Sequence, residues 1–230
     1  MNRWLAPVVL ALTAGCSNLT EVQGGIVALE VTLPSPPVIE VNESLQLSAR
    51  ALNKDGDSVA ATIVWSAADP TLTVDPSTGV LTGVSPGTGR VQASVGSLTS
   101  GVLTFSVIAP ADTIILSADS VLTVAPDVAQ SAPLTVQLQS FSPPGPVDGR
   151  PVIYAITSPD PATTTPTVAF LNGLSEDTAT TATDGTVTSV ILTRIPNITA
   201  PDTAIVTVRA ARTRGSVVPG SGQRFIVLFQ

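Results

Sequence analysis

Short runs of β-branched and apolar residues, separated by turns rich in proline and glycine, repeat along the chain from Ile26 to Gln230. β-Branched side chains fit a pleated strand, and proline and glycine mark the turns that end strands. No long window has the periodicity and the end residues of an amphipathic helix. The sequence therefore predicts an all-β fold.

The segment from Ser44 to Leu52 shows the pattern most clearly, because apolar and polar residues alternate along it. Leu45, Leu47 and Ala49 fall on one face, and polar side chains fall on the other. This alternation predicts one half-buried strand with a solvent-facing side. Several such strands at regular spacing are typical of a β-sandwich.

The first residues have a different character, because Arg3 is followed by the apolar run Trp4–Leu12 and by the small residues Thr13, Ala14 and Gly15. A positive start, a short apolar run and a small-residue exit indicate a secretory signal peptide. The apolar run would span about 14 Å as a helix, about half of a bilayer core. It is therefore too short for a transmembrane helix.

The only cysteine of the chain, Cys16, comes directly after this exit. Leu12-Thr13-Ala14-Gly15-Cys16 resembles the lipobox of bacterial lipoproteins. The resemblance implies a cleaved signal peptide over residues 1–15, lipidation (palmitate among the acyl chains) on Cys16, and a lipidated tether over residues 16–25. Ser17 in the next position implies a lipid-anchored protein of the cell envelope, at the outer membrane or cell surface. An ordinary signal peptide with a chance cysteine is the alternative.

Four motifs follow one another in the first half: Val41-Asn42-Glu43-Ser44, Val64-Trp65-Ser66, Asp75–Leu81 (DPSTGVL) and Pro86-Gly87-Thr88-Gly89. Residues 26–108 resemble the group 2 bacterial immunoglobulin-like domain (BIG2), with Asn42 at a position where that family usually has glycine. The resemblance implies a sandwich domain over residues 26–110. We expect Trp65 to fill the space between its two sheets and Gly79 to supply a positive φ.

Three shorter motifs mark the second half: Gly149-Arg150-Pro151-Val152, Thr183–Val187 (TDGTV) and Ala204–Ala210 (AIVTVRA). Residues 112–230 resemble the invasin/intimin-type group 1 bacterial immunoglobulin-like domain. This implies a second sandwich over residues 111–230, so the chain is expected to hold two tandem immunoglobulin-like domains. The junction Ala109-Pro110-Ala111 is short, and its proline restricts rotation. An extended stalk with a restricted angle is the expected arrangement.

The residues of catalysis are scarce. The chain has no histidine, and its single thiol lies at the predicted lipid site. It contains no nucleophile elbow, Walker loop or dinucleotide-binding motif. The carboxylates lie mostly in turns with proline, glycine or serine. We therefore expect no enzyme, no catalytic residue and no cofactor.

One acidic loop allows a metal hypothesis. Asp55 and Asp57 flank Gly56, with Asn53 close by, and such oxygen ligands suit calcium. A hairpin turn needs the same residue types, and we expect the turn and no metal. Asp112 and Asp119 near the junction allow the same alternative, and Asp184 before Gly185 is expected to be a turn residue.

Charge and aromatic content narrow the choice of partner. A net charge of −7 with a single lysine argues against nucleic acid. We expect Arg209, Arg212, Arg214 and Arg224 at solvated strand and hairpin positions, with a small anion patch as the alternative. A sugar platform needs several exposed rings, whereas aromatic residues are 3% of the chain and Trp65 is assigned to the core.

These features predict a membrane-anchored surface lipoprotein with a structural, spacer or adhesive role. The expected partners are the membrane, through the lipid on Cys16, and an envelope protein or a surface glycan. The alternative is a ligand- or glycan-binding accessory lipoprotein that uses the loops of the second domain.

Overall fold

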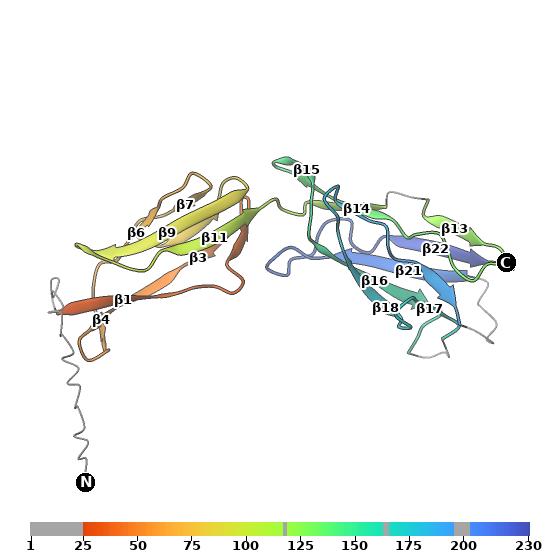
Figure 1. The fold of residues 1–230 in the computed structure, drawn as a ribbon, viewed down its shortest axis with the longest axis horizontal. Coiled ribbons are helices and arrows are strands. Elements are labelled where there is room, and N and C mark those ends of the chain that lie inside the picture. Colours follow the sequence, from red (N-terminus) through yellow and green to blue (C-terminus); the bar gives the residue numbers. More distant parts are fainter. Residues whose placement is uncertain (1–24, 117–118, 163–165, 196–202) are drawn as a thin grey trace, which may run out of the picture.

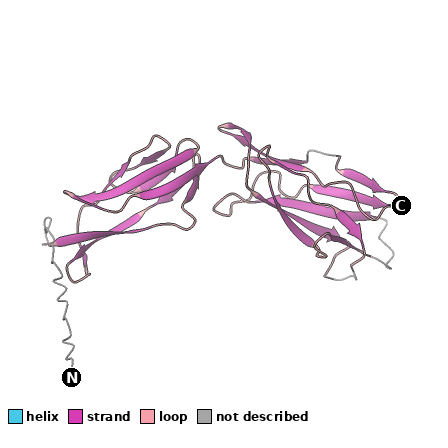
Figure 2. Ribbon diagram, viewed as in Figure 1, coloured by secondary structure: helices cyan, strands magenta, loops and turns pink. Residues whose placement is uncertain are grey.

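The structure is a computed structural model. It describes residues 25–116, 119–162, 166–195 and 203–230. Figures 1 and 2 show these residues as two β-sandwiches joined end to end, the N-terminal sandwich before residue 109 and the C-terminal sandwich after residue 110. The described residues form strands, turns and loops, and no helix among them is long and apolar enough to cross a membrane. The predicted all-β sandwich fold is confirmed.

Three sheets build the N-terminal sandwich. The largest contains β2 (Val38–Glu40), β6 (Val64–Ala67), β9 (Gly87–Val95), β10 (Leu98–Thr99) and β11 (Leu103–Ile108). The second contains β1 (Ile26–Thr32), β4 (Ser48–Asn53) and β5 (Ser58–Val59), and the third β3 (Ser44–Gln46), β7 (Leu72–Val74) and β8 (Val80–Gly83). β9 is the centre of the largest sheet, with β6 along one edge and β10 and β11 along the other.

The prediction of a single strand from Ser44 to Leu52 is wrong in one respect. Its alternation is correct, because Leu47 is buried and its polar neighbours are exposed. However, the chain divides at Leu47 into β3, which pairs with β8, and β4, which pairs with β1. The Leu47 amide donates to the carbonyl of Gly79, which follows the register of the β3–β8 pair by one more residue. The segment thus changes sheets while its apolar side stays on one core.

The main core cluster of the N-terminal sandwich, with the partly buried residues packed against it, takes residues from all three sheets, and Ile26, Ala51 and Val95 form a smaller cluster. Trp65 is 5% exposed and packs with Leu47, Leu72 and Phe105, so its predicted position between the sheets is confirmed. A Cβ built on Gly89 would lie 2.3 Å from the side chain of Leu72. Gly89 therefore belongs to the core packing of β9.

The C-terminal sandwich is built around one five-stranded sheet, in the order β13 (Val121–Val124), β22 (Arg224–Phe229), β21 (Thr203–Ala210), β16 (Pro151–Ser158) and β18 (Glu176–Thr180). A second sheet contains β12 (Thr113–Leu116), β14 (Val136–Phe141), β15 (Pro144–Pro146) and β19 (Thr186–Val187). β17 (Val168–Phe170) pairs with β20 (Leu192–Arg194). The inward faces of these strands enclose a second, separate core that contains Tyr154, Phe170 and Phe225.

Each sandwich joins an early strand to its last strand in parallel. β2 pairs with β11 in the N-terminal sandwich, and β13 pairs with β22 in the C-terminal one. Because β11 leads directly into the junction, its parallel partner β2 also ends there, at Glu40. The fold thus places the Glu40 carboxylate, at the end of an apolar strand, at the boundary between the sandwiches.

Candidate functional site: a polar joint between the sandwiches

A tight turn after β2 positions Glu40. The amide of Glu43 donates to the carbonyl of Glu40 at 3.0 Å, and the Glu43 carboxylate accepts from the amide of Glu40 at 2.7 Å. Asn42 has a φ of 65°, the left-handed region in which asparagine replaces glycine at low cost. Gly83 lets β8 approach, because a Cβ there would lie 2.4 Å from the Glu40 carbonyl oxygen.

A hairpin of the C-terminal sandwich meets this carboxylate. The turn after β21 closes with the Gly215 amide donating to the carbonyl of Arg212, and Gly215 has a φ of +86°. At its tip, the backbone amide and the hydroxyl of Thr213 each donate to Glu40 Oε1 at 2.9 Å. The contact joins residues far apart in sequence, one from each sandwich.

Arg150, at the start of β16, completes the contact. Its Nη2 lies 2.5 Å from Glu40 Oε1, and its Nη1 donates to the Thr213 hydroxyl at 2.7 Å. The Arg150 side chain is 9% exposed and the Glu40 side chain 3%, so this ion pair is buried. Nη2 also lies 3.3 Å from the carbonyl of Ala109 in the linker. We refer to Glu40, Arg150, Thr213 and the linker contacts as the joint.

Two arginines of the same hairpin surround the joint. Arg212 Nη2 donates to Asp112 at 2.5 Å, and its Nε donates to the carbonyl of Ala111 at 3.1 Å. Arg214 lies 3.3 Å from the Glu43 carboxylate and donates to the carbonyl of Val38 at 2.7 Å. Both side chains are only about one-third exposed.

The expectation that the arginine cluster is solvated is therefore wrong for Arg212 and Arg214, which are held by carboxylates of both sandwiches and by the linker. It is right for Arg224, which is exposed, and for Arg209, which makes an exposed ion pair with Glu176 at 2.9 Å. Sequence reasoning did not predict that Arg212 and Arg214 are held in this way, because the carboxylates of Glu40 and Glu43 lie far from them in the chain.

The polar groups of the joint bind one another. Oε1 of Glu40 accepts three hydrogen bonds, and the charge of Arg150 is neutralised by the carboxylate it touches. An open hollow of about 310 Å³ lies beside the joint, lined mainly by apolar residues of both sandwiches, including Val107, Ile108, Pro146 and Val147. Asp148 and Arg150 are the charged residues of its lining. The arrangement suits fixing two bodies together.

Asp55 and Asp57 take part in the expected hairpin turn. Both of their amides donate to Asn53 Oδ1 at 2.9 Å, and Gly56 has a φ of +86°. Lys54 pairs with Asp55 on the surface. Among the described residues, no group of three or more acidic or thiol side chains is placed to hold a metal ion.

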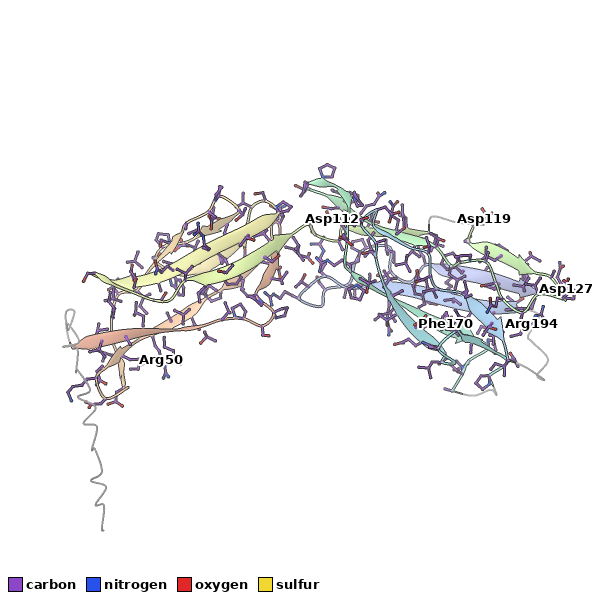
Figure 3. All side chains as sticks on the ribbon, viewed as in Figure 1. Arg50, Asp112, Asp119, Asp127, Phe170 and Arg194 are labelled. Carbon is purple, nitrogen blue, oxygen red and sulfur yellow. The ribbon has the colours of Figure 1, made fainter. Side chains whose placement is uncertain are left out.

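The other acidic candidates are not brought together. Figure 3 shows Asp112 at the junction and Asp119 well away from it on the C-terminal sandwich. Asp184 is a turn residue as expected, because its carboxylate accepts from the amide and the hydroxyl of Thr186 at 2.9 and 2.7 Å. These bonds lower the pKa of Asp184, with the Thr186 hydroxyl as the main cause.

The aromatic side chains form no exposed platform. Trp65 and Tyr154 are buried in the two cores, and Phe141 is the exposed ring among the described aromatic residues. Burial raises the pKa of Tyr154, and the nearby Asp177 charge raises it further. Trp4 and Cys16 lie outside the described residues, so the lipid anchor remains a prediction from sequence.

Glu40 and Arg150 are the functional residues that sequence reasoning missed. Arg150 was quoted only as part of a strand motif, and Glu40 received no role. A signal was present in each case, since Glu40 interrupts an apolar strand and Arg150 stands between a glycine and a proline at a strand start. Their partnership across the boundary is visible only in the folded chain.

No family model matches this sequence, and no curated protein matches it. The structure is similar to the Yersinia pseudotuberculosis adhesin InvE, with 18% identity and a TM-score of 0.41, over 88% of this chain and 58% of that one. It is similar to domains 4 and 5 of the S-layer protein SbsC, with 19% identity and a TM-score of 0.31, over 89% of this chain and 98% of that one. It is also similar to the fibronectin(III)-like modules of Clostridium thermocellum CbhA, with 14% identity and a TM-score of 0.37, over 87% and 93%. The chain thus spans just over half of the InvE structure.

Proposed function

We propose that this protein is a surface lipoprotein whose two sandwiches form a spacer between a lipid anchor on Cys16 and a distal binding partner. The observation that carries the proposal is the end-to-end placement of the sandwiches through the joint. In Figure 1, β1 begins at the end of the N-terminal sandwich that faces away from the C-terminal one. A chain anchored before β1 would therefore hold its C-terminal sandwich away from the membrane.

The anchor follows from acyl chemistry. Each buried CH₂ contributes about 0.8 kcal/mol, and stable attachment takes more than one chain. A lipoprotein cysteine with two or three chains meets that requirement. The outer membrane or cell surface is the proposed location, on the strength of Ser17.

The distal role is structural or adhesive, and the partner is an envelope protein or a surface glycan. A ligand-binding accessory role for loops of the C-terminal sandwich is the second candidate. It is disfavoured because the hollow beside the joint is lined mainly by apolar side chains and the exposed aromatic side chains are few. Saturable binding of a purified envelope polysaccharide to the full chain would favour this second candidate.

The experiment for the anchor compares the wild-type chain with Cys16→Ser in membrane fractions of the producing cell. The wild-type chain is expected in the membrane fraction after high-salt washing, and Cys16→Ser is expected to be lost from it. Thr20→Ala serves as the matched control, because it changes a residue of the predicted tether without altering Cys16 or Ser17. Membrane retention of Cys16→Ser equal to that of the wild type would overturn the proposal.

The domain limits at residues 26–110 and 111–230 are part of the same proposal. The separate cores support it, since among the described residues no member of the C-terminal core cluster belongs to either cluster of the N-terminal sandwich. Expression of the two halves should give two proteins that each unfold cooperatively.

A further inference from the structure

We infer that the joint is a single-position lock: the Glu40 carboxylate, held by the hairpin around Thr213 and by Arg150, makes the two sandwiches move as one body. The inference deepens the proposed spacer function, because a spacer with a free hinge would not hold its distal end in a fixed direction. The inference concerns the orientation of the sandwiches, so it would stand even if Cys16 carried no lipid.

The contacts are directional enough to fix an orientation. The Thr213 amide is held by the hairpin backbone, so the position of Glu40 Oε1 relative to the hairpin is set by a 2.9 Å bond from a rigid donor. The Thr213 hydroxyl donates to the same oxygen and accepts from Arg150, which closes a ring of three hydrogen bonds. Rotation of one sandwich about the linker would break together the three bonds that Glu40 Oε1 accepts from Thr213 and Arg150, whereas the bond between Arg150 and Thr213 lies within the C-terminal sandwich.

Burial makes rotation costly. Glu40 and Arg150 are almost fully removed from solvent by each other and by their neighbours. Separating a buried pair leaves each charge without its partner, which is far more costly than losing an exposed ion pair. An exposed salt bridge at the same place would allow the sandwiches to rotate about the linker, whereas the buried pair of Glu40 and Arg150 does not.

The linker is part of the lock. The carbonyls of Ala109 and Ala111 accept from Arg150 and Arg212, and Pro110 and Ala111 are buried. The Arg214 contact with the carbonyl of Val38 adds a bond to the strand that carries Glu40. The C-terminal sandwich thus binds both the linker and the strand β2 through hydrogen bonds to their backbone carbonyls.

The test measures the distance between the sandwiches by pulsed electron–electron resonance. The full chain carries Cys16→Ser, and spin labels are attached at Ser97→Cys in the N-terminal sandwich and Thr178→Cys in the C-terminal one, both exposed positions. The unaltered joint is expected to give one narrow distance distribution. Glu40→Gln keeps the shape and removes the charge, and it is expected to widen the distribution at least about twofold, because Arg150 loses its buried partner.

Glu30→Gln is the matched control, since Glu30 makes an exposed ion pair with Arg50 inside the N-terminal sandwich. It is expected to leave the distribution unchanged. Thr213→Val, which removes only the bridging hydroxyl, provides a milder second variant, and it is expected to widen the distribution less than Glu40→Gln. A broad distribution in the unaltered chain would overturn the inference, and so would a Glu40→Gln distribution as narrow as that of Glu30→Gln. Either result would leave the membrane fractionation of Cys16→Ser unaffected, so the two proposals fail separately.

Discussion

Gly79 leaves the space into which the indole of Trp65 fits: a Cβ built on Gly79 would lie 2.6 Å from Trp65 Nε1 and 2.9 Å from Cε2. Gly79 also has a φ of +73°, which ends the Asp75 turn. The turn and the core of the N-terminal sandwich therefore depend on the same missing side chain. The backbone amide of Trp65 also donates to the carbonyl of Pro76 in that turn, at 3.0 Å.

Gly79→Ala is expected to destabilise the chain. The left-handed backbone alone costs about 1–3 kcal/mol for a residue other than glycine, and displacement of the indole adds to it. Chemical denaturation of the full chain with Trp4→Phe, in which Trp65 is the remaining tryptophan, measures the loss by fluorescence. Gly101→Ala is the control, because nothing lies within 4 Å of its Cβ position. An equal effect of the two substitutions would contradict the packing role of Gly79.

Trp65→Ala is expected to lower the free energy of unfolding of the N-terminal sandwich by about 3–5 kcal/mol, since it empties the largest side-chain volume of that core. A thermal melt followed by far-ultraviolet circular dichroism measures the change. The neighbouring Val64, which is 45% exposed, gives the control Val64→Ala. If Trp65→Ala melted at the wild-type midpoint, the indole would not be a core residue.

The Asp75 turn makes part of the stability depend on pH. The Thr78 amide and the Ser77 hydroxyl donate to its carboxylate at 2.7 and 2.8 Å, and these bonds, the Thr78 amide first, lower the pKa of Asp75 from 3.8 to about 2. A carboxyl with a lowered folded-state pKa contributes stability above pH 3.8, and this contribution is lost as the pH falls towards 2.

The denaturation midpoint of the wild-type chain should therefore fall more steeply with acid across that interval than the midpoint of Asp75→Asn. Asparagine keeps an acceptor oxygen and does not titrate, so the two curves should converge at low pH. Parallel curves throughout would mean that the turn does not hold an ionised carboxylate.

The acidic loop at Asp55 and Asp57 is expected to bind no calcium, because its amides and Asn53 already satisfy the turn. A ligand that binds only the folded chain raises its melting midpoint. Melts in millimolar calcium and in chelator should therefore coincide. A higher midpoint in calcium that disappears in Asp57→Asn would show that the loop is a metal site.

Local rules account for what the sequence predicted well. The alternation around Leu47, the Asn53 and Asp184 turns, and the burial of Trp65 each depend on residues close in the chain or on one large apolar side chain. Features of this kind are set by residues close in the chain, so the sequence is enough to predict them.

Long-range pairing accounts for what the sequence did not predict. The division of the strand at Leu47 depends on which strands β3 and β4 meet, and these partners are β8 and β1. The joint depends on a carboxylate at the end of β2 and a hairpin after β21 arriving at one place. The pattern of apolar and polar residues predicts neither the strand pairing at Leu47 nor the contact between Glu40 and the hairpin, because strand order is decided by the packing of whole sheets.

The central claim is that the two sandwiches lie end to end as one extended body, and small-angle X-ray scattering of the full chain with Cys16→Ser tests it most directly. The account predicts an elongated envelope with two lobes, and a pair-distance distribution with a shoulder from distances between the lobes. The curve should match the structure without a mixture of orientations. A compact, single-lobed envelope would contradict the account, because the C-terminal sandwich would then fold back and could not extend away from a lipid anchor.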